Sequence, residues 1–170
     1  KTNRQSPYYK FEESVKQRLN DECIWSREGC FSWLQTYEHV NQYGNWFQSR
    51  GVKANDFVAL YMTNSPYFMF TWLGLWSIGA APAMINHNLT GKALLDCLKV
   101  CKAKILLVDE MHEVKSRVES VRDQIEKETD LSILSLEELK RDKIQLETKR
   151  PDDKYRSGVK GDSPIAMFFT

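Results

Sequence analysis

The chain has 170 residues, of which 42% are hydrophobic, and this is enough material for one domain with a substantial core. Its 24 basic and 23 acidic side chains leave a formal net charge of +1, so overall charge gives no reason to expect nucleic acid as a partner. The four cysteines form no paired CxxC motif, and the first residues do not resemble a secretory signal, so we expect an intracellular, reducing environment.

Residues 1–35 read as a lead-in segment that precedes the regular part of the chain. The sequence predicts a short helix near residues 11–19 and a hairpin that turns at Glu28 and Gly29. A longer helix follows, for which Thr36 is the predicted cap and Gly51 the left-handed end. The turn "GVKAND" then leads into a strand, "FVALYM".

The stretch from residue 63 to residue 91 contains no Asp, Glu, Lys or Arg and must be tested as a membrane span. Pro66 and the break at Gly79 leave about 13 residues for a helix, roughly 20 Å long, which falls short of a ~30 Å hydrocarbon core. We therefore expect a buried helix that enters at Ser65 and Pro66, followed by a strand, "APAMIN".

An aromatic stripe at helical spacing lies on the first of these elements, formed by Phe68, Trp72 and Trp76. A wall for an acyl chain and a membrane-facing surface are two functional interpretations. Core packing explains the same spacing more simply, and we favour it.

The second half of the chain continues the alternation of helices and strands. It predicts a helix capped by Thr90, a strand at 104–109, one helix over 114–125, a strand "LSIL" and a helix with a capping box at Ser135 and Glu138. The charged residues 141–164 read as a surface connection, and "PIAMFFT" reads as a final buried strand. This order predicts an α/β fold with a mostly parallel sheet flanked by helices.

Chemistry-bearing residues are few, and they predict neither a catalytic group nor a metal site. His87 lies in "INHNLTG" directly after a strand, where open α/β sheets bind ligands; a loop histidine capped by neighbouring amides is the simpler interpretation. Cys97 and Cys101 stand four residues apart on one helix, and two half-buried thiols explain them better than half of a metal site.

Residues 36–109 resemble the opening of the adenylate-forming superfamily of acyl-CoA synthetases. They share its Thr-Tyr helix start, Gly-Val…Asp turn, Asn-Ser-Pro helix entry and Gly-Ala strand approach. The segment "INHNLTGKALLDCLKVCKAKILLVD" is most similar to the fatty-acid transport protein and very-long-chain acyl-CoA synthetase branch. The resemblance implies that residues 36–170 are the first α/β subdomain of the large AMP-binding domain, truncated before its phosphate-binding loop.

The resemblance also implies a reaction for the full-length protein. A fatty carboxylate attacks the α-phosphate of ATP to give an acyl-adenylate, and coenzyme A then displaces AMP to give a thioester. Thr170 would stand at the threshold of the loop that wraps the ATP phosphates, and His87 would lie on the substrate side. Because the Lys, the Mg²⁺ ligands and the mobile C-terminal domain follow this segment in the family, we expect the chain alone to be inactive and to bind no cofactor tightly.

Two other readings stay open at this point. A truncated relative of the same fold would serve as a non-catalytic module that binds lipid or protein, because a half-sheet exposes an apolar edge that needs a partner. A component of a membrane transporter is the other. In the leading reading the partners are a fatty acid and the remainder of the same polypeptide, and the full-length protein is associated with the endoplasmic reticulum, peroxisome or plasma membrane.

Overall fold

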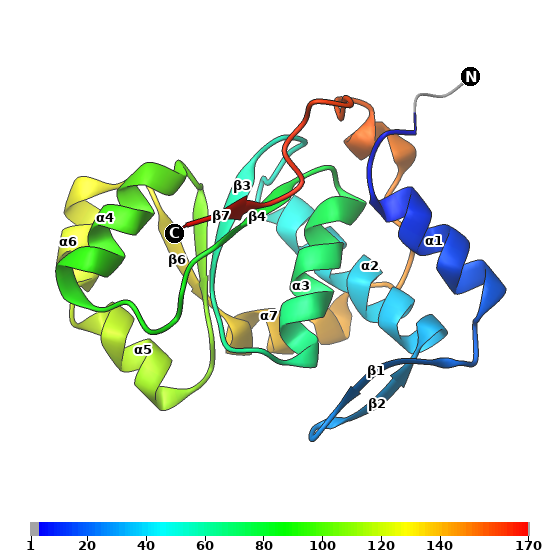
Figure 1. Cartoon of the computed structure of the whole chain (residues 1–170), viewed down its shortest axis with the longest axis horizontal. Coiled ribbons are helices and arrows are strands. Elements are labelled where there is room, and N and C mark those ends of the chain that lie inside the picture. The colour runs from blue at the N-terminus through cyan, green and yellow to red at the C-terminus, as the bar shows by residue number, and fades with distance from the viewer. Residues whose placement is uncertain (1–3, 170) are drawn as a thin grey trace.

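The computed structural model describes residues 4–169 and contains a five-stranded parallel sheet with helices on both faces (Figure 1). The strands lie in the order β6-β5-β3-β4-β7. Their bounds are β3 Phe57–Tyr61, β4 Ala81–Met84, β5 Ile105–Val108, β6 Ser132–Ser135 and β7 Met167–Phe168. The predicted α/β fold with a parallel sheet is confirmed.

Two helical layers enclose this sheet and divide the core in two. One layer contains α1 Tyr8–Gln17, α2 Trp33–Ser49, α3 Pro66–Ser77 and α7 Leu136–Asp142, and the other contains α4 Gly91–Cys101, α5 His112–Glu119 and α6 Arg122–Glu128 (Figure 1). Along β3 the side chains alternate between the layers: Val58 and Leu60 join the first, Ala59 and Tyr61 the second. The sheet is covered on both faces, which explains the unbroken apolar runs of its central strands.

Short elements complete the chain outside the sheet. The strands β1 Glu22–Ser26 and β2 Gly29–Ser32 form an antiparallel hairpin, as predicted, with the turn at Arg27 and Glu28. The 3₁₀ helices η1 Lys143–Gln145 and η2 Asp153–Arg156 lie in the last connection. The first helix begins three residues earlier than predicted, at Tyr8, directly after Pro7.

The prediction that Thr36 caps the long helix was wrong. The helix begins at Trp33, and Ser32 is its cap: the Ser32 hydroxyl accepts from the Gln35 backbone N–H at 3.2 Å, and the Gln35 side chain accepts from the Ser32 N–H at 2.9 Å. This reciprocal capping box fixes the start one turn earlier. Thr36 consequently lies inside the first turn and is fully buried.

Two further predictions about helices need correction. The stripe from Val114 to Ile125 was expected to lie on one helix, but the chain breaks at Val121 (φ −127°, ψ 11°) and forms α5 and α6 instead. Both helices still bury their apolar side chains in the same layer, so the stripe predicted the buried face correctly. Thr90 stands at the start of α4, but its side chain makes no capping hydrogen bond.

The helices α2 and α3 pack closely because glycines face each other where they meet. A Cβ at Gly44 would lie 3.0 Å from the Gly74 carbonyl oxygen and 2.0 Å from the Ser77 hydroxyl. A Cβ at Gly74 would lie 2.8 Å from the Cβ of Tyr43. A larger residue at either position would push α2 and α3 apart. The two glycines therefore determine the distance between these helices.

Residues 141–164 lie on the surface as predicted, but they are fastened to α2. The side-chain amides of Asn41, Gln42 and Asn45 donate to the carbonyls of Thr148, Leu146 and Lys149 at 3.2, 3.0 and 2.9 Å. The prediction missed Arg156, which is only 2% exposed. The segment therefore belongs to the folded body, because its backbone is bound along its length.

The last strand, β7, confirms that the end of the described chain returns to the sheet. Met167 and Phe168 pair parallel with Ala83 and Met84 of β4. The strand is shorter and less buried than predicted: of the described residues 164–169 only Met167 and Phe168 pair, Ile165 lies in a bend before them, and Phe168 and Ile165 are 66% and 52% exposed. The physical reason is that β7 has one neighbouring strand within residues 4–169 and forms an edge of the sheet.

Candidate functional site

The carboxyl ends of the five parallel strands meet at one edge of the sheet, where ligands bind in open α/β folds. The strand β3 connects through α3 on one face, whereas its neighbour β5 connects through α5 on the other. Two adjacent strands whose connections leave on opposite faces open a crevice between their loops. The loops that follow β3, β4 and β5, together with Phe169 at the end of β7, therefore form the candidate site.

Asp109 closes the crevice between β3 and β5. Its carboxylate is 3% exposed and accepts from the backbone N–H and the hydroxyl of Thr63, both at 2.8 Å, and from the Met111 N–H at 3.1 Å. These bonds join the two loops across the crevice. Both carboxylate oxygens already accept hydrogen bonds from these loops, so the role of Asp109 in the described residues is to position the loops.

The loop after β4 contains His87 and is fixed through its backbone. The hydroxyl of Tyr61 donates to the Leu89 carbonyl at 2.5 Å, and Arg117 of α5 donates to the His87 carbonyl at 2.6 Å. The side chain of Asn86 accepts from the Asn88 N–H at 2.9 Å. The loop is therefore held by side chains from β3 and α5 rather than by its own regular structure.

The imidazole of His87 is half-buried and has no hydrogen-bond partner among residues 4–169. The simpler sequence interpretation had neighbouring amides capping this ring, but the described amides do not bond to it. Thr170, the other residue singled out, lies outside the described residues. Its predecessor Phe169 stands at the end of β7, next to the loop that carries His87.

A groove of about 400 Å³ opens between that loop, α4 and the end of β7. It is lined mainly by apolar side chains, with two polar residues at the rim: Leu89, Ala93, Cys97, Val100, Phe169, Asn86 and Asp96. Burial raises the pKa of the Cys97 thiol, so this thiol is protonated at neutral pH. The groove offers apolar contact rather than a nucleophile.

The aromatic stripe of α3 packs against the core only in part. Its three residues are half-buried, whereas the buried face of α3 carries Phe70, Thr71, Gly74 and Leu75. Phe68 and Trp76 contact the first core layer. The same stripe also holds the last strand: the indole N–H of Trp76 donates to the Ile165 carbonyl at 2.7 Å, and the rings of Trp72 and Phe168 lie 6.4 Å apart, edge to face. The stripe therefore fixes β7 against the sheet.

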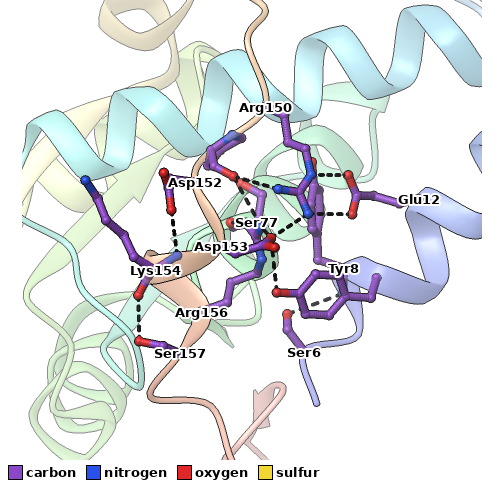
Figure 2. Close-up of polar contacts among 12 residues, drawn as sticks. Ser6, Tyr8, Glu12, Ser77, Arg150, Asp152, Asp153, Lys154, Arg156 and Ser157 are labelled. Atoms are coloured by element: carbon purple, nitrogen blue, oxygen red, sulfur yellow. Dashed lines mark hydrogen bonds and ion pairs between the residues drawn. The ribbon is translucent and has the colours of Figure 1, made fainter. Parts of the chain in front are cut away.

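A second concentration of charge lies away from this edge, between α1 and the last connection (Figure 2). Arg150 forms a two-pronged ion pair with Glu12, at 2.5 and 2.9 Å, and also bonds to Asp153 at 2.6 Å. Arg156 bonds to Asp153 at 2.5 Å, donates to the Ser77 carbonyl at the end of α3 and lies over the Tyr8 ring. We call the following five residues the arginine network: Tyr8, Glu12, Arg150, Asp153 and Arg156.

The electrostatics of the arginine network fit a structural role. Burial alone would raise the pKa of Glu12, but hydrogen bonds from Arg150 and Tyr37 hold it below its usual range. Burial also opposes ionisation of Asp153, yet Arg150 and Arg156 lower its pKa to about 2. Both carboxylates are charged at neutral pH and bonded within the chain, so the network locks α1 to the last connection.

No helix in residues 4–169 combines the length and the apolar character needed to cross a bilayer. No group of three His, Cys, Asp or Glu side chains in the same residues is arranged to hold a metal ion.

The comparison with protein families decides the assignment. A model of the family described as AMP-binding enzyme matches residues 11–170. The chain belongs to this family. The resemblance drawn from residues 36–109 is confirmed, and the match extends over most of the segment read as a lead-in.

Relatives within the family include proteins named for fatty acids. The chain is 32% identical over 120 residues to long-chain fatty acid transport protein 2 of Rattus norvegicus, which covers 69% of this chain and 19% of that protein. It is 30% identical over 124 residues to the very long-chain fatty acid transport protein of Cochliobolus heterostrophus, covering 72% and 19%. It is 40% identical over 121 residues to isopenicillin N epimerase component 1 of Hapsidospora chrysogena, covering 71% and 20%. The chain spans about one fifth of each relative.

Solved structures of the family share the fold. A fatty acyl CoA synthetase of Mycobacterium tuberculosis superposes with a TM-score of 0.89 at 15% identity, covering all of this chain and 33% of that one. The anthranilate CoA ligase AuaEII, in complex with anthranoyl-AMP, superposes with a TM-score of 0.75 at 20% identity, covering 85% and 28%. At these identities the likeness shows the fold.

Sequence reasoning missed the residues that fix the candidate site. Asp109 had a signal, since it is the first acidic residue after an apolar strand at the expected edge. Tyr61 and Thr63 gave weaker signals, because Tyr61 reads as an ordinary strand residue and Thr63 as an ordinary loop residue. Arg117 gave none: it lies on the polar side of α5, and its bond to the His87 loop depends on the tertiary fold.

Proposed function

We propose that this chain contributes the first α/β subdomain of an ATP-dependent long- or very-long-chain fatty acyl-CoA synthetase. The observation that carries the proposal is the position of β7. This strand pairs parallel with β4 and ends beside the His87 loop, at the sheet edge where α/β folds bind nucleotides. In this proposal residues 36–170 form the subdomain and residues 1–35 lead into it.

The proposed reaction joins a carboxylate to the α-phosphate of ATP and then transfers the acyl group to coenzyme A. Adenylation brings two anions together, so it needs positioned N–H donors and cations. Thr170 would lie where such a phosphate loop begins, and His87 would face the substrate. The full-length protein would work inside the cell at a membrane surface, and Mg²⁺ would accompany ATP.

We further propose that the 170 residues are inactive alone. Arg117, the cation that contacts the His87 loop, already donates to the His87 carbonyl. The remainder of the polypeptide would pair with the open edge of β7 and supply the phosphate loop. A non-catalytic module of the same fold is less well supported, because the relatives named above include transport proteins and ligase-like structures of the same family.

The acyl specificity needs a test of its own, because the relative at 40% identity is named for an epimerase component rather than for fatty acids. A polypeptide that extends past Thr170 would be incubated with ATP, Mg²⁺, coenzyme A and saturated fatty acids of increasing length. We expect AMP and acyl-CoA to form together, with the highest rates for long chains. Formation of thioester only with short or aromatic acids would refute the fatty-acid assignment while leaving the family assignment intact.

A further inference from the structure

A second cluster of reactive groups, separate from the proposed nucleotide edge, lies where α2, α3 and η1 meet. The amine nitrogen of Lys143 lies 3.2 Å from the Nδ1 atom of His39. The His39 ring stacks on Phe70, with 4.6 Å between centroids, and the amine also lies 5.4 Å from the centre of the Tyr43 ring. An amine thus contacts an imidazole nitrogen, and aromatic rings surround the pair.

Lys140 provides an internal comparison only three residues away. Its amine forms an ion pair with Glu110 at 2.6 Å and lies 3.4 Å from the centre of the Tyr67 ring. Lys143 has no carboxylate within ion-pair distance among residues 4–169. Two neighbouring lysines therefore share aromatic contacts, but only Lys140 has a counter-charge that favours its ammonium form.

The protonation states follow from these surroundings. Burial, and to a smaller extent the charge of Lys143, lowers the pKa of His39 to about 4, so its ring is neutral at pH 7. Burial and the nearby Lys140 lower the pKa of the Lys143 amine. The titratable groups that face the Lys143 amine include Tyr43 on α2 and Lys140 on α7; Tyr67 and Glu110 lie next to Tyr43, and Glu110 is engaged by Lys140.

We propose that Lys143 is a nucleophilic lysine that becomes N-acylated by activated acyl groups, with His39 Nδ1 accepting a hydrogen bond that orients its amine. The neutral amine attacks the carbonyl carbon of a thioester, a C–N bond forms and the C–S bond breaks. The bonding electron pair leaves with sulfur, the nitrogen loses its proton to water, and the thiolate takes up a proton from water. An acyl phosphate reacts in the same way with phosphate as the leaving group, and neither reaction needs an oxidant or reductant.

Modification at this site would have a structural consequence. An amide at Lys143 is larger than the amine and can no longer be protonated, so the acylated side chain must leave the imidazole or push it from Phe70. Because η1 is also fastened to α2 through the Gln42 amide, acylation would act on the junction between these elements. The inference does not depend on the proposed acyl-CoA synthetase activity.

The test compares the two lysines within one protein. The whole chain would be incubated at pH 7 with acetyl phosphate and, separately, with a small acetyl thioester, and acetylation would be quantified at every lysine by peptide mass spectrometry. We expect Lys143 to react at least about tenfold faster than Lys140, because Glu110 holds Lys140 as an ammonium ion and a pKa difference of one unit between two amines changes the reactive fraction about tenfold. From pH 7 to 9 an ordinary lysine, with a pKa near 10.4, speeds up about tenfold per unit; Lys143 should gain less.

The variant His39→Phe removes the hydrogen-bond acceptor of the amine and keeps an aromatic ring against Phe70. Acetylation of Lys143 should fall about threefold or more, the loss expected for one hydrogen bond, while that of Lys140 stays unchanged. Unchanged circular dichroism would establish that the variant is folded; if it does not fold, the ratio of the two lysines in the unaltered chain decides. Equal rates at Lys143 and Lys140 with both donors, or a folded His39→Phe protein that reacts normally at Lys143, would overturn the proposal.

Discussion

The arginine network and the carboxyl edge of the sheet both gather polar side chains, but they satisfy them differently. In the network the Glu12 carboxylate meets Arg150, and the buried Arg156 meets Asp153 and a helix-end carbonyl. At the edge, the loop after β4 is held through its backbone, and the His87 imidazole has no partner in the described part of the chain. Charged side chains that are paired within the chain therefore stabilise the fold, whereas a polar side chain without a partner at a strand end indicates a candidate site.

Replacement of Arg156 should give the largest effect on stability. The side chain is fully buried, so Arg156→Met leaves the Ser77 carbonyl without its side-chain donor, removes one of two donors to the Pro151 carbonyl and leaves Asp153 with one cation fewer. Loss of one partner from a buried charged network costs about 3–5 kcal/mol. Urea unfolding at pH 7 measures this change.

The matched control is Lys10→Met, which removes an ion pair to Glu13 on a side chain that is 82% exposed. Exposed pairs contribute roughly 0–1 kcal/mol. Similar losses of unfolding free energy in the two variants would show that the arginine network does not stabilise the contact between α1 and the last connection.

Replacement of Asp109 tests the hydrogen bonds that join the loops after β3 and β5. In Asp109→Asn the amide nitrogen faces at least one of the donors on Thr63 and Met111, and a buried donor left unpaired costs about 1–3 kcal/mol. Thr63→Val keeps the backbone bond and removes only the hydroxyl, so about 1 kcal/mol is expected. If Asp109→Asn unfolds at the urea concentration of the unaltered chain, this carboxylate does not close the crevice.

Acid should weaken the arginine network. The folded-state pKa values of Glu12 and Asp153 lie below their unfolded values, near 4, and that of Asp153 is about 2. A depressed carboxyl pKa contributes stability that is present above the unfolded pKa and is lost as pH falls through the folded pKa. Stability should therefore decline between about pH 4 and pH 2.

Urea titrations at intervals of pH measure that decline, and Glu12→Gln should make it shallower. The contribution of Asp153 is smaller than its pKa suggests, because its side chain is 42% exposed and solvent screens its partners. A steeper acid loss in Glu12→Gln than in the unaltered chain would contradict this assignment.

Replacement of His87 should have the smallest effect. Arg117 bonds to the backbone carbonyl at this position, so His87→Ala leaves the anchor of the loop in place. Surface changes of this kind usually stay within about 0.5 kcal/mol. Thermal unfolding of His87→Ala, with Asn88→Ala as the exposed neighbour for comparison, checks this; a loss above about 1 kcal/mol would show that the imidazole supports the fold.

The sheet could be predicted from the sequence because its strands are covered on both faces. Apolar runs without alternation at 57–61 and 105–108, separated by helical stripes, permit little besides a parallel sheet. The helix at Ser65 and Pro66 was equally clear, since both residues act locally: the Ser65 hydroxyl accepts from the Phe68 N–H at 3.3 Å.

Features that depend on distant residues could not be predicted. Arg156 lies in a segment whose charge reads as surface, and its burial follows from partners in η2 and at the end of α3. The break at Val121 keeps both helices on the same face, so the apolar stripe does not reveal it. At the candidate site, His87 was found from its place after a strand, but its anchors Tyr61 and Arg117 come from other elements.

Calorimetric titration with ATP tests the central claim most directly. Two polypeptides would be compared in the presence of Mg²⁺: the 170-residue chain, and one that extends past Thr170 through the following segment of the AMP-binding domain. The account predicts saturable binding by the longer polypeptide and no measurable binding by the shorter one. Tight binding of ATP by the 170 residues alone, or no binding by the longer polypeptide, would contradict the assignment of the nucleotide site to the end of β7.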